Sequence, residues 1–285
     1  MSHLIFFGIY FVVLNFLVKQ KRVFVKKILS FTLLPISLYG ILQIHYMERV
    51  TSTFGQPNWL AAYIVMVFPL LVEQFIYEKS KLLWGAIGFL SLITLVFTGS
   101  LSGFIGLMVV SVFFIVKLKV LKYFFILAVA FFVFNFNFFK YRISDALIFS
   151  TNPESYNISD SNIIRYGLLK GSLNLFTSKP KNILVGVGLE NFAYEYPFFR
   201  DNILNYSSEW SFILNKPHNY YIEILVESGL VGFGSYILLM IYTLRSKNKF
   251  LIASFLGFYA ANFFGWPTVS TSLVFWVLLA CREDT

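Results

Sequence analysis

Apolar runs of nearly membrane-spanning length recur along most of this 285-residue chain. A helix needs roughly 20 mostly apolar residues to cross the hydrocarbon core of a bilayer. Only 13% of the residues are charged, whereas roughly a quarter are charged in a soluble domain. The sequence therefore predicts an all-α, polytopic membrane bundle of about nine transmembrane helices, at residues 4–18, 28–44, 59–77, 82–97, 101–116, 123–139, 220–244, 250–265 and 267–281.

The formal charge of +9 comes largely from lysines and arginines in the short connections between these runs. Basic connections alternate with neutral ones such as "TGSLSG" along the chain. Because basic connections stay in the cytoplasm, the N-terminus is expected outside and the C-terminus inside. Topology thus accounts for the positive charge, and we expect no nucleic-acid partner. The predicted division is an N-terminal group of about six spans (1–139), a large extracytoplasmic loop (140–219) and a C-terminal group of about three spans (220–285).

The long loop carries the signals of amphipathic helices. "SDSNIIRYGLLKGSLNLFTSKP" opens with helix-capping residues and stops at a proline. Its apolar stripe is predicted to hold Ile164, Leu168, Leu169, Leu173 and Phe176. One interpretation is a helix lying on the bilayer surface, with its cations facing lipid phosphates. A G-x-G follows, but outside a strand–helix unit it is poor support for a nucleotide site.

The stretch "PHNYYIEILVESGLVG" places polar residues at the start of an apolar run. Asn219, Glu223 and Glu227 would stack at i, i+4 and i+8 on one helix face. Ionised carboxylates facing lipid are costly, so this stripe should face the protein interior. His218 lies at its rim, where it is either an interfacial side chain or part of a site.

The available side chains restrict the chemistry of such a site. The sequence shows no paired acids of the D-x-D kind in its outer connections, no histidine or cysteine cluster at metal-ligand spacing, and no G-x-S-x-G. What remains is one general base, His218, and arginines in the outer loop. This combination suits deprotonation of an acceptor hydroxyl and binding of a phosphate-bearing donor by guanidinium groups. We expect neither a metal nor a cofactor.

Four stretches, in this order along the chain, resemble the O-antigen ligase and O-antigen polymerase superfamily. They are "FGQPNWLAAYIVMVFPLL", "TGSLSGFIGL", "RYGLLKGSLNLFTSKPKNILVGVGLENF" and "PHNYYIEILVESGLVG". The resemblance implies metal-independent glycan transfer from an undecaprenyl-diphosphate carrier, on the outer face of the bacterial cytoplasmic membrane. His218 would activate the acceptor hydroxyl and Arg165 would hold the diphosphate. On the substrate side we place Asn219, Glu223 and Glu227, and we add Arg200 as a further outer-loop cation.

The sequence departs from the family pattern in two ways. Ser100 is followed by Leu101, where the family hairpin often has an arginine; Lys140 or Arg142 would be a replacement. The large loop follows the sixth span instead of the ninth, so about three N-terminal spans are expected to be absent.

Several interpretations stay open at this point. The acceptor is another glycan repeat for a polymerase, and lipid A core or protein for a ligase; we favour polymerisation or exopolysaccharide assembly slightly. A transporter or flippase for the same lipid-linked glycan is an alternative, although we find no internal repeat of the kind common in transporters. An inactive, truncated paralogue is another.

Overall fold

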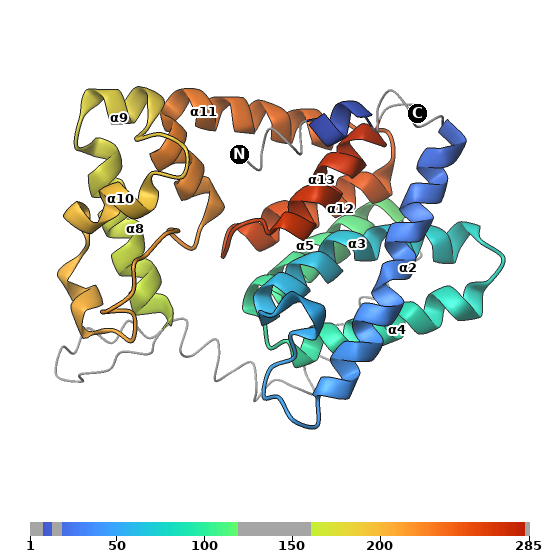
Figure 1. Cartoon of the computed structure of the whole chain (residues 1–285). Helices are drawn as coiled ribbons and strands as arrows, with labels where there is room; N and C mark the ends of the chain where they lie inside the picture. Colours follow the sequence, from blue (N-terminus) through green and yellow to red (C-terminus); the bar gives the residue numbers. More distant parts are fainter. Residues whose placement is uncertain (1–7, 13–18, 119–160, 283–285) are drawn as a thin grey trace. The chain divides into compact units, whose positions relative to one another are not determined.

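The structure is a computed structural model that describes residues 8–12, 19–118 and 161–282 (Figure 1). Its regular elements are helices, which confirms the predicted all-α class for the described residues. In chain order they are α2 (Lys19–Gln43), η1 (Ser52–Phe54), α3 (Pro57–Tyr77), α4 (Lys81–Phe97), α5 (Leu101–Leu118), α8 (Ser161–Thr177), α9 (Pro180–Val185), α10 (Phe192–Glu195), η2 (Tyr196–Phe199), η3 (Asn202–Tyr206), α11 (Tyr220–Leu244), α12 (Lys249–Asn262) and α13 (Val269–Ala280).

Three helices of the described residues are long and apolar enough to cross a membrane: residues 21–43 within α2, the whole of α3, and α11. α4, α5 and α13 are apolar but shorter. The bounds of α4 and α5 agree within two residues with the predicted spans 82–97 and 101–116. The predicted spans 4–18 and 123–139 lie outside the described residues, apart from 8–12. The total of nine spans therefore stays a prediction.

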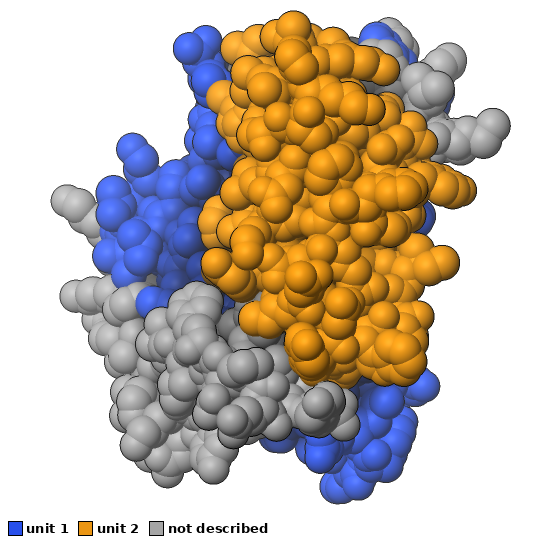
Figure 2. Space-filling model, turned by 90° about the vertical axis from the view of Figure 1, so that its left-hand side faces the viewer, with its two compact units in different colours: residues 1–122, 240–262, 267–285 blue, residues 123–239, 263–266 orange. Residues whose placement is uncertain are grey.

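The chain divides into two compact units, which Figure 2 colours separately. Unit 1 comprises residues 1–122, 240–262 and 267–285, and unit 2 comprises residues 123–239 and 263–266. These units are defined by contacts within the protein, whereas the predicted division at residues 139 and 219 separates membrane-spanning segments from the extracytoplasmic loop. That topological division stays a prediction.

α3 is the central helix of unit 1 and packs against α2, α4, α5 and α12. Its Leu60 side chain is fully buried. Glycines on two neighbouring helices permit the close approach. A Cβ on Gly103 of α5 would lie 2.5 Å from the Cβ of Ala61, and one on Gly257 of α12 would lie 3.0 Å from the carbonyl oxygen of Val65. Small residues at helix crossings are typical of bundles packed within a membrane.

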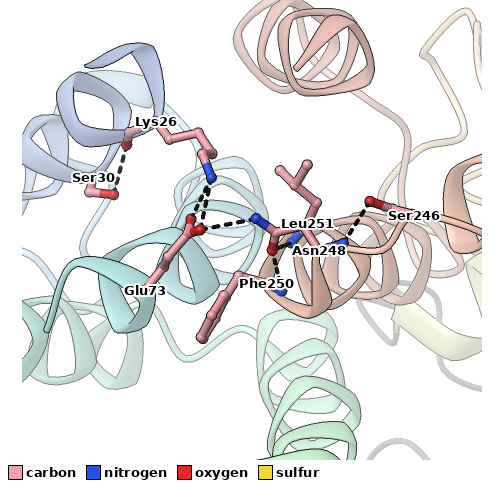
Figure 3. Close-up of polar contacts among 7 residues, drawn as sticks. All are labelled: Lys26, Ser30, Glu73, Ser246, Asn248, Phe250 and Leu251. Carbon is pink, nitrogen blue, oxygen red and sulfur yellow. Dashed lines mark hydrogen bonds and ion pairs between the residues drawn. The ribbon is translucent and has the colours of Figure 1, made fainter. Parts of the chain in front are cut away.

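A charged cluster joins three helices of unit 1. Lys26 of α2 donates from its Nζ to both carboxylate oxygens of Glu73 of α3, at 2.8 and 3.0 Å (Figure 3). Asn248 donates from its Nδ2 to the same carboxylate at 3.0 Å, and its Oδ1 accepts from the first amides of α12. α2 thus begins well before residue 28, the predicted start of the span, and Lys26 forms an ion pair with Glu73 inside the bundle.

Candidate functional site

The described part of the predicted loop folds around an apolar core of its own. α8 contributes Ile164, Leu168 and Leu175. They pack with buried side chains from the rest of unit 2: Phe192, Tyr196, Leu204, Leu214 and Val226. The predicted stripe was partly wrong, because Leu169 and Leu173 are each 40% exposed while Leu175, which it omitted, is fully buried. The buried face of α8 therefore packs against protein, and this corrects the interpretation in which that face lies on the bilayer.

α11 is interrupted at Gly229, where φ is 65° and ψ is −167°. The backbone of α9 lies against the interruption, since a Cβ on Gly229 would be 2.4 Å from the carbonyl group of Leu184. The predicted span over 220–244 has the bounds of α11, which is long and apolar enough to cross a membrane, and the interruption at Gly229 is an addition to that prediction. Residues 230–244 form the longer part of the helix, about 22 Å at 1.5 Å per residue, and residues 220–228 pack within unit 2.

The segment with the G-x-G sequence lies against the backbone of α11 just before this interruption. Gly186 and Gly188 have φ values of 71° and 105°. A Cβ on Gly186 would lie 2.3 Å from the carbonyl group of Glu227. The amides of Val187 and Gly188 donate to the carbonyl oxygens of Val226 and Glu227 at 3.0 and 2.9 Å. The two glycines therefore permit a backbone-to-backbone contact, and that contact satisfies carbonyl groups at the end of the first helical segment.

Glu223 and Glu227 are buried, as the predicted polar stripe requires. Lys216 forms an ion pair with Glu223, with 2.6 Å between Nζ and Oε1, and approaches Glu190 Oε2 at 3.4 Å. Glu227 accepts a hydrogen bond at Oε2 from the backbone amide of Glu190, at 3.0 Å. Burial alone would lower the pKa of Lys216, but the attraction of the surrounding carboxylates outweighs it and raises the pKa. The lysine is therefore held as a cation against the start of α11.

His218 occupies a tight turn directly before α11. Its φ is +55°, a left-handed conformation that is uncommon for residues other than glycine. Asn219 caps the helix, because its Oδ1 accepts from the amides of Tyr221 and Ile222 at 3.0 and 3.1 Å. The imidazole ring meets the indole of Trp266 edge-on, with 5.0 Å between centroids. The turn thus places the imidazole against an aromatic neighbour.

Arg165 of α8 is electrostatically coupled to this histidine. Its guanidinium group lies over the ring of Phe264, 5.9 Å from the centroid. Burial, and secondarily the positive charge of Arg165, lower the pKa of His218 to about 4. The histidine is therefore neutral at physiological pH and its ring can accept a proton. Among the described residues, no hydrogen bond or ion pair engages the Arg165 guanidinium.

Arg200, the additional cation of the sequence analysis, makes different contacts. Its Nη2 donates to the carbonyl oxygens of Leu204 and Glu209, at 3.3 and 3.0 Å. These bonds stabilise the turn around η3. Its described contacts are with loop backbone, and the structure brings it into contact with neither Arg165 nor His218 among the described interactions.

Two aromatic residues of the site, Phe264 and Trp266, were missed by sequence reasoning. Both belong to the turn between α12 and α13, which the sequence shows only as the uncharged connection "GWPT" and the end of the preceding run. The available signal was the presence of large aromatic residues in a predicted outer turn, on the same side of the membrane as the loop. Their pairing with Arg165 and His218 depends on the fold of unit 2.

Comparison with known proteins identifies the family. A family model described as O-antigen ligase matches residues 86–237, more than half of the chain. The chain belongs to the O-antigen ligase family. No curated protein and no solved structure matches it significantly. The matched segment of this O-antigen ligase family member includes Arg165, His218, Glu223 and Glu227, and ends before Phe264 and Trp266. Membership, together with the candidate spans, makes it a multi-pass membrane protein, and implies ligase- or polymerase-type glycan transfer in cell-surface polysaccharide assembly.

Proposed function

We propose that this protein transfers or polymerises glycan from an undecaprenyl-diphosphate-linked donor onto an acceptor hydroxyl. The transfer would occur on the extracytoplasmic face of the bacterial cytoplasmic membrane. The observation that carries the proposal is the coupling of Arg165 to His218 within unit 2: a guanidinium with no anionic partner among the described residues acts electrostatically on a neutral imidazole. A phosphate-binding cation and a proton acceptor are the two groups that this reaction needs.

The proposed step is a displacement at the anomeric carbon of the donor sugar. The acceptor oxygen attacks this carbon while its proton passes to the imidazole of His218. The bond from the anomeric carbon to the phosphate oxygen breaks, and undecaprenyl diphosphate leaves with the electron pair. Arg165 holds the diphosphate and stabilises the charge that develops on it, because a guanidinium binds phosphate oxygens bidentately. The guanidinium supplies the cation, so the proposed transfer requires no metal.

The remaining predicted residues are proposed to shape the substrate side of the site. Arg200, Asn219, Glu223 and Glu227 already make protein contacts in the described structure. They would therefore act mainly by holding the loop and the start of α11 in place. Glu223 Oε2 and Glu227 Oε1 are buried and have no hydrogen-bond partner among the described residues, so they would bind a sugar hydroxyl only after the surrounding side chains move.

Substitution of Arg165 tests this proposal. Arg165→Lys keeps the charge but loses the planar fork, and we expect transfer to fall by about tenfold or more. Arg165→Ala should cost about 10²-fold or more. The assay is glycan transfer by the purified protein in nanodiscs, with a lipid-diphosphate-linked donor and with a chelator present throughout. Lys170→Ala, which removes a largely exposed cation of the same helix, is the matched control. Wild-type rates for Arg165→Ala, or an absolute need for a divalent cation, would contradict the mechanism.

A further inference from the structure

An ion pair connects the residues before and after the turn that carries His218. Lys216 precedes the histidine by two residues and pairs with Glu223, one turn into α11, with 2.6 Å between Nζ and Oε1. The two side chains are 17% and 8% exposed. Between them lie Pro217, which is buried, and His218 with its left-handed backbone. The pair therefore joins the two ends of the segment 216–223, which contains His218 in an unfavourable backbone conformation.

We propose that Lys216 and Glu223 form a positioning pair, which fixes the turn and thereby aims the His218 imidazole at the acceptor. This inference rests on the proposed function, because it assigns a role relative to His218 as the base. A non-glycine residue in a left-handed conformation persists only where its surroundings determine it. Here the ion pair fixes the segment on the loop side, and the Asn219 cap fixes it on the helix side.

The pair is also anchored to the rest of unit 2. Lys216 approaches Glu190 at 3.4 Å, and the backbone amide of Glu190 donates to Glu227. Glu190 is 61% exposed, so its own attraction to Lys216 is weakened by solvent. Glu223 is the principal partner because it is buried and closer. Displacing Lys216 would thus free the His218 turn from α11 while the contacts of Glu227 with the glycine segment stay in place.

The charged groups around His218 determine how its pKa should change when the turn is disturbed. Arg165 belongs to α8 and, in addition to burial, lowers the pKa of the imidazole, whereas Lys216 and Glu223 precede and follow His218 in the chain. Trp266 contacts the ring, with 5.0 Å between the ring centroids. When the turn loosens, His218 should become more solvated and move relative to Arg165. Both changes let its pKa return toward the ordinary value of about 6.5.

The test compares Lys216→Met with a charge-exchanged variant, Lys216→Glu/Glu223→Lys. Transfer is measured over a pH series in the full-length protein in nanodiscs. For Lys216→Met we expect kcat to fall by about tenfold or more, because small displacements of a catalytic group are costly. KM for the donor should stay unchanged, and the acid limb of the profile should shift upward. The exchanged pair should recover part of kcat and return the limb toward its original position. Lys170→Met, which breaks the ion pair of Lys170 with Asp201 elsewhere in unit 2, should leave all three quantities unchanged.

Three results would overturn the positioning role. One is wild-type kcat and an unshifted acid limb in Lys216→Met. Another is a raised donor KM with unchanged kcat, which would make Lys216 a donor ligand. The third is a charge-exchanged variant that folds but recovers nothing. The proposed function is judged separately by His218→Ala: if that variant is active, the proposed function fails. If His218→Ala is inactive and Lys216→Met is fully active, only the positioning role fails.

Discussion

His218 differs from an ordinary histidine because of what surrounds it. Its ring is half-buried beside Trp266, and the charge of Arg165 opposes its protonation. A solvated histidine has a pKa of about 6.5, and ionised glutamates nearby would raise it. In the structure, burial and the charge of Arg165 lower the pKa of His218 instead, while the carboxylate of Glu223 is paired with Lys216.

The consequence at the residue scale is an unusual pH dependence. A base must be neutral to accept a proton, so activity is lost as the pH falls through its pKa. With a pKa of about 4 for His218, the acid limb of kcat/KM should lie near pH 4, and activity should be nearly constant from about pH 5.5 to 7. Initial rates over a pH series check this, with tryptophan fluorescence over the same series to detect unfolding. A limb centred near pH 6.5 would show that the histidine is solvated and apart from Arg165.

The residue types of the site were predictable, but their environment was not. His218 stands out as a histidine at the rim of a polar stripe that enters an apolar run, whereas Arg165 was assigned through the resemblance to the O-antigen ligase superfamily. The left-handed backbone of His218 has no sequence signal, since glycine and asparagine are the usual residues there. The partner of Lys216 could not be predicted from the sequence either, because the ion pair forms only when the turn brings residue 216 back to α11.

At the scale of the element, the interruption of α11 is the feature on which the site depends. It lets residues 220–228 pack within unit 2 with their two carboxylates buried, while the following residues continue as an apolar helix. Average hydropathy cannot detect such a break, since it depends on composition and not on backbone angles. The sequence "ESGLVGFG" contains glycines, but only the close contact with α9 determines that Gly229 is the one that bends.

Substitution of two glycines in this helix, one at a time, tests whether the interruption itself is required or whether any glycine in the helix has the same effect. Gly229→Ala places a Cβ 2.4 Å from the Leu184 carbonyl at a φ of +65°, and should cost about 1–3 kcal/mol or more of stability. Activity should fall with it, because the Val187–Gly188 contact is displaced. Gly234→Ala is the matched control, because a Cβ there meets nothing within 4 Å. It should be neutral, or stabilising by up to about 1 kcal/mol. Tm in detergent and transfer activity are the measurements; equal effects of the two changes would argue against a required break.

In the whole molecule, the proposed reaction needs the loop of residues 140–219, which carries Arg165 and His218, on the extracytoplasmic side. The alternation of basic and neutral connections predicts this sidedness from the sequence, and hydropathy located α4 and α5 well. The ends of the later spans were less predictable. α12 and α13 end at Asn262 and Ala280. The turn between them belongs to unit 2, and this assignment follows from tertiary contacts that the sequence does not show.

Thiol labelling in intact cells tests the sidedness. Ser208→Cys in unit 2 should react with a membrane-impermeant reagent, whereas Lys247→Cys, between α11 and α12, should not. Both positions are exposed, and Ser208 is preferable to its neighbour Ser207, which is buried. The background protein carries Cys281→Ser, because Cys281 is the single cysteine of the sequence. Labelling with the opposite pattern would place the loop of residues 140–219 in the cytoplasm and separate the proposed site from its substrate.

The most direct test of the account is the transfer activity of His218→Ala beside His45→Ala. His45 is exposed and belongs to unit 1, so its loss should leave transfer near the wild-type rate. Loss of the proposed base should lower transfer by about 10²–10⁴-fold. Expression and membrane insertion should be unchanged, since the imidazole is only half-buried. The measurement is surface glycan on gels in a deletion strain complemented with each variant. We expect strongly reduced product with His218→Ala and normal product with His45→Ala; normal product with His218→Ala would contradict the assignment of His218 as the base.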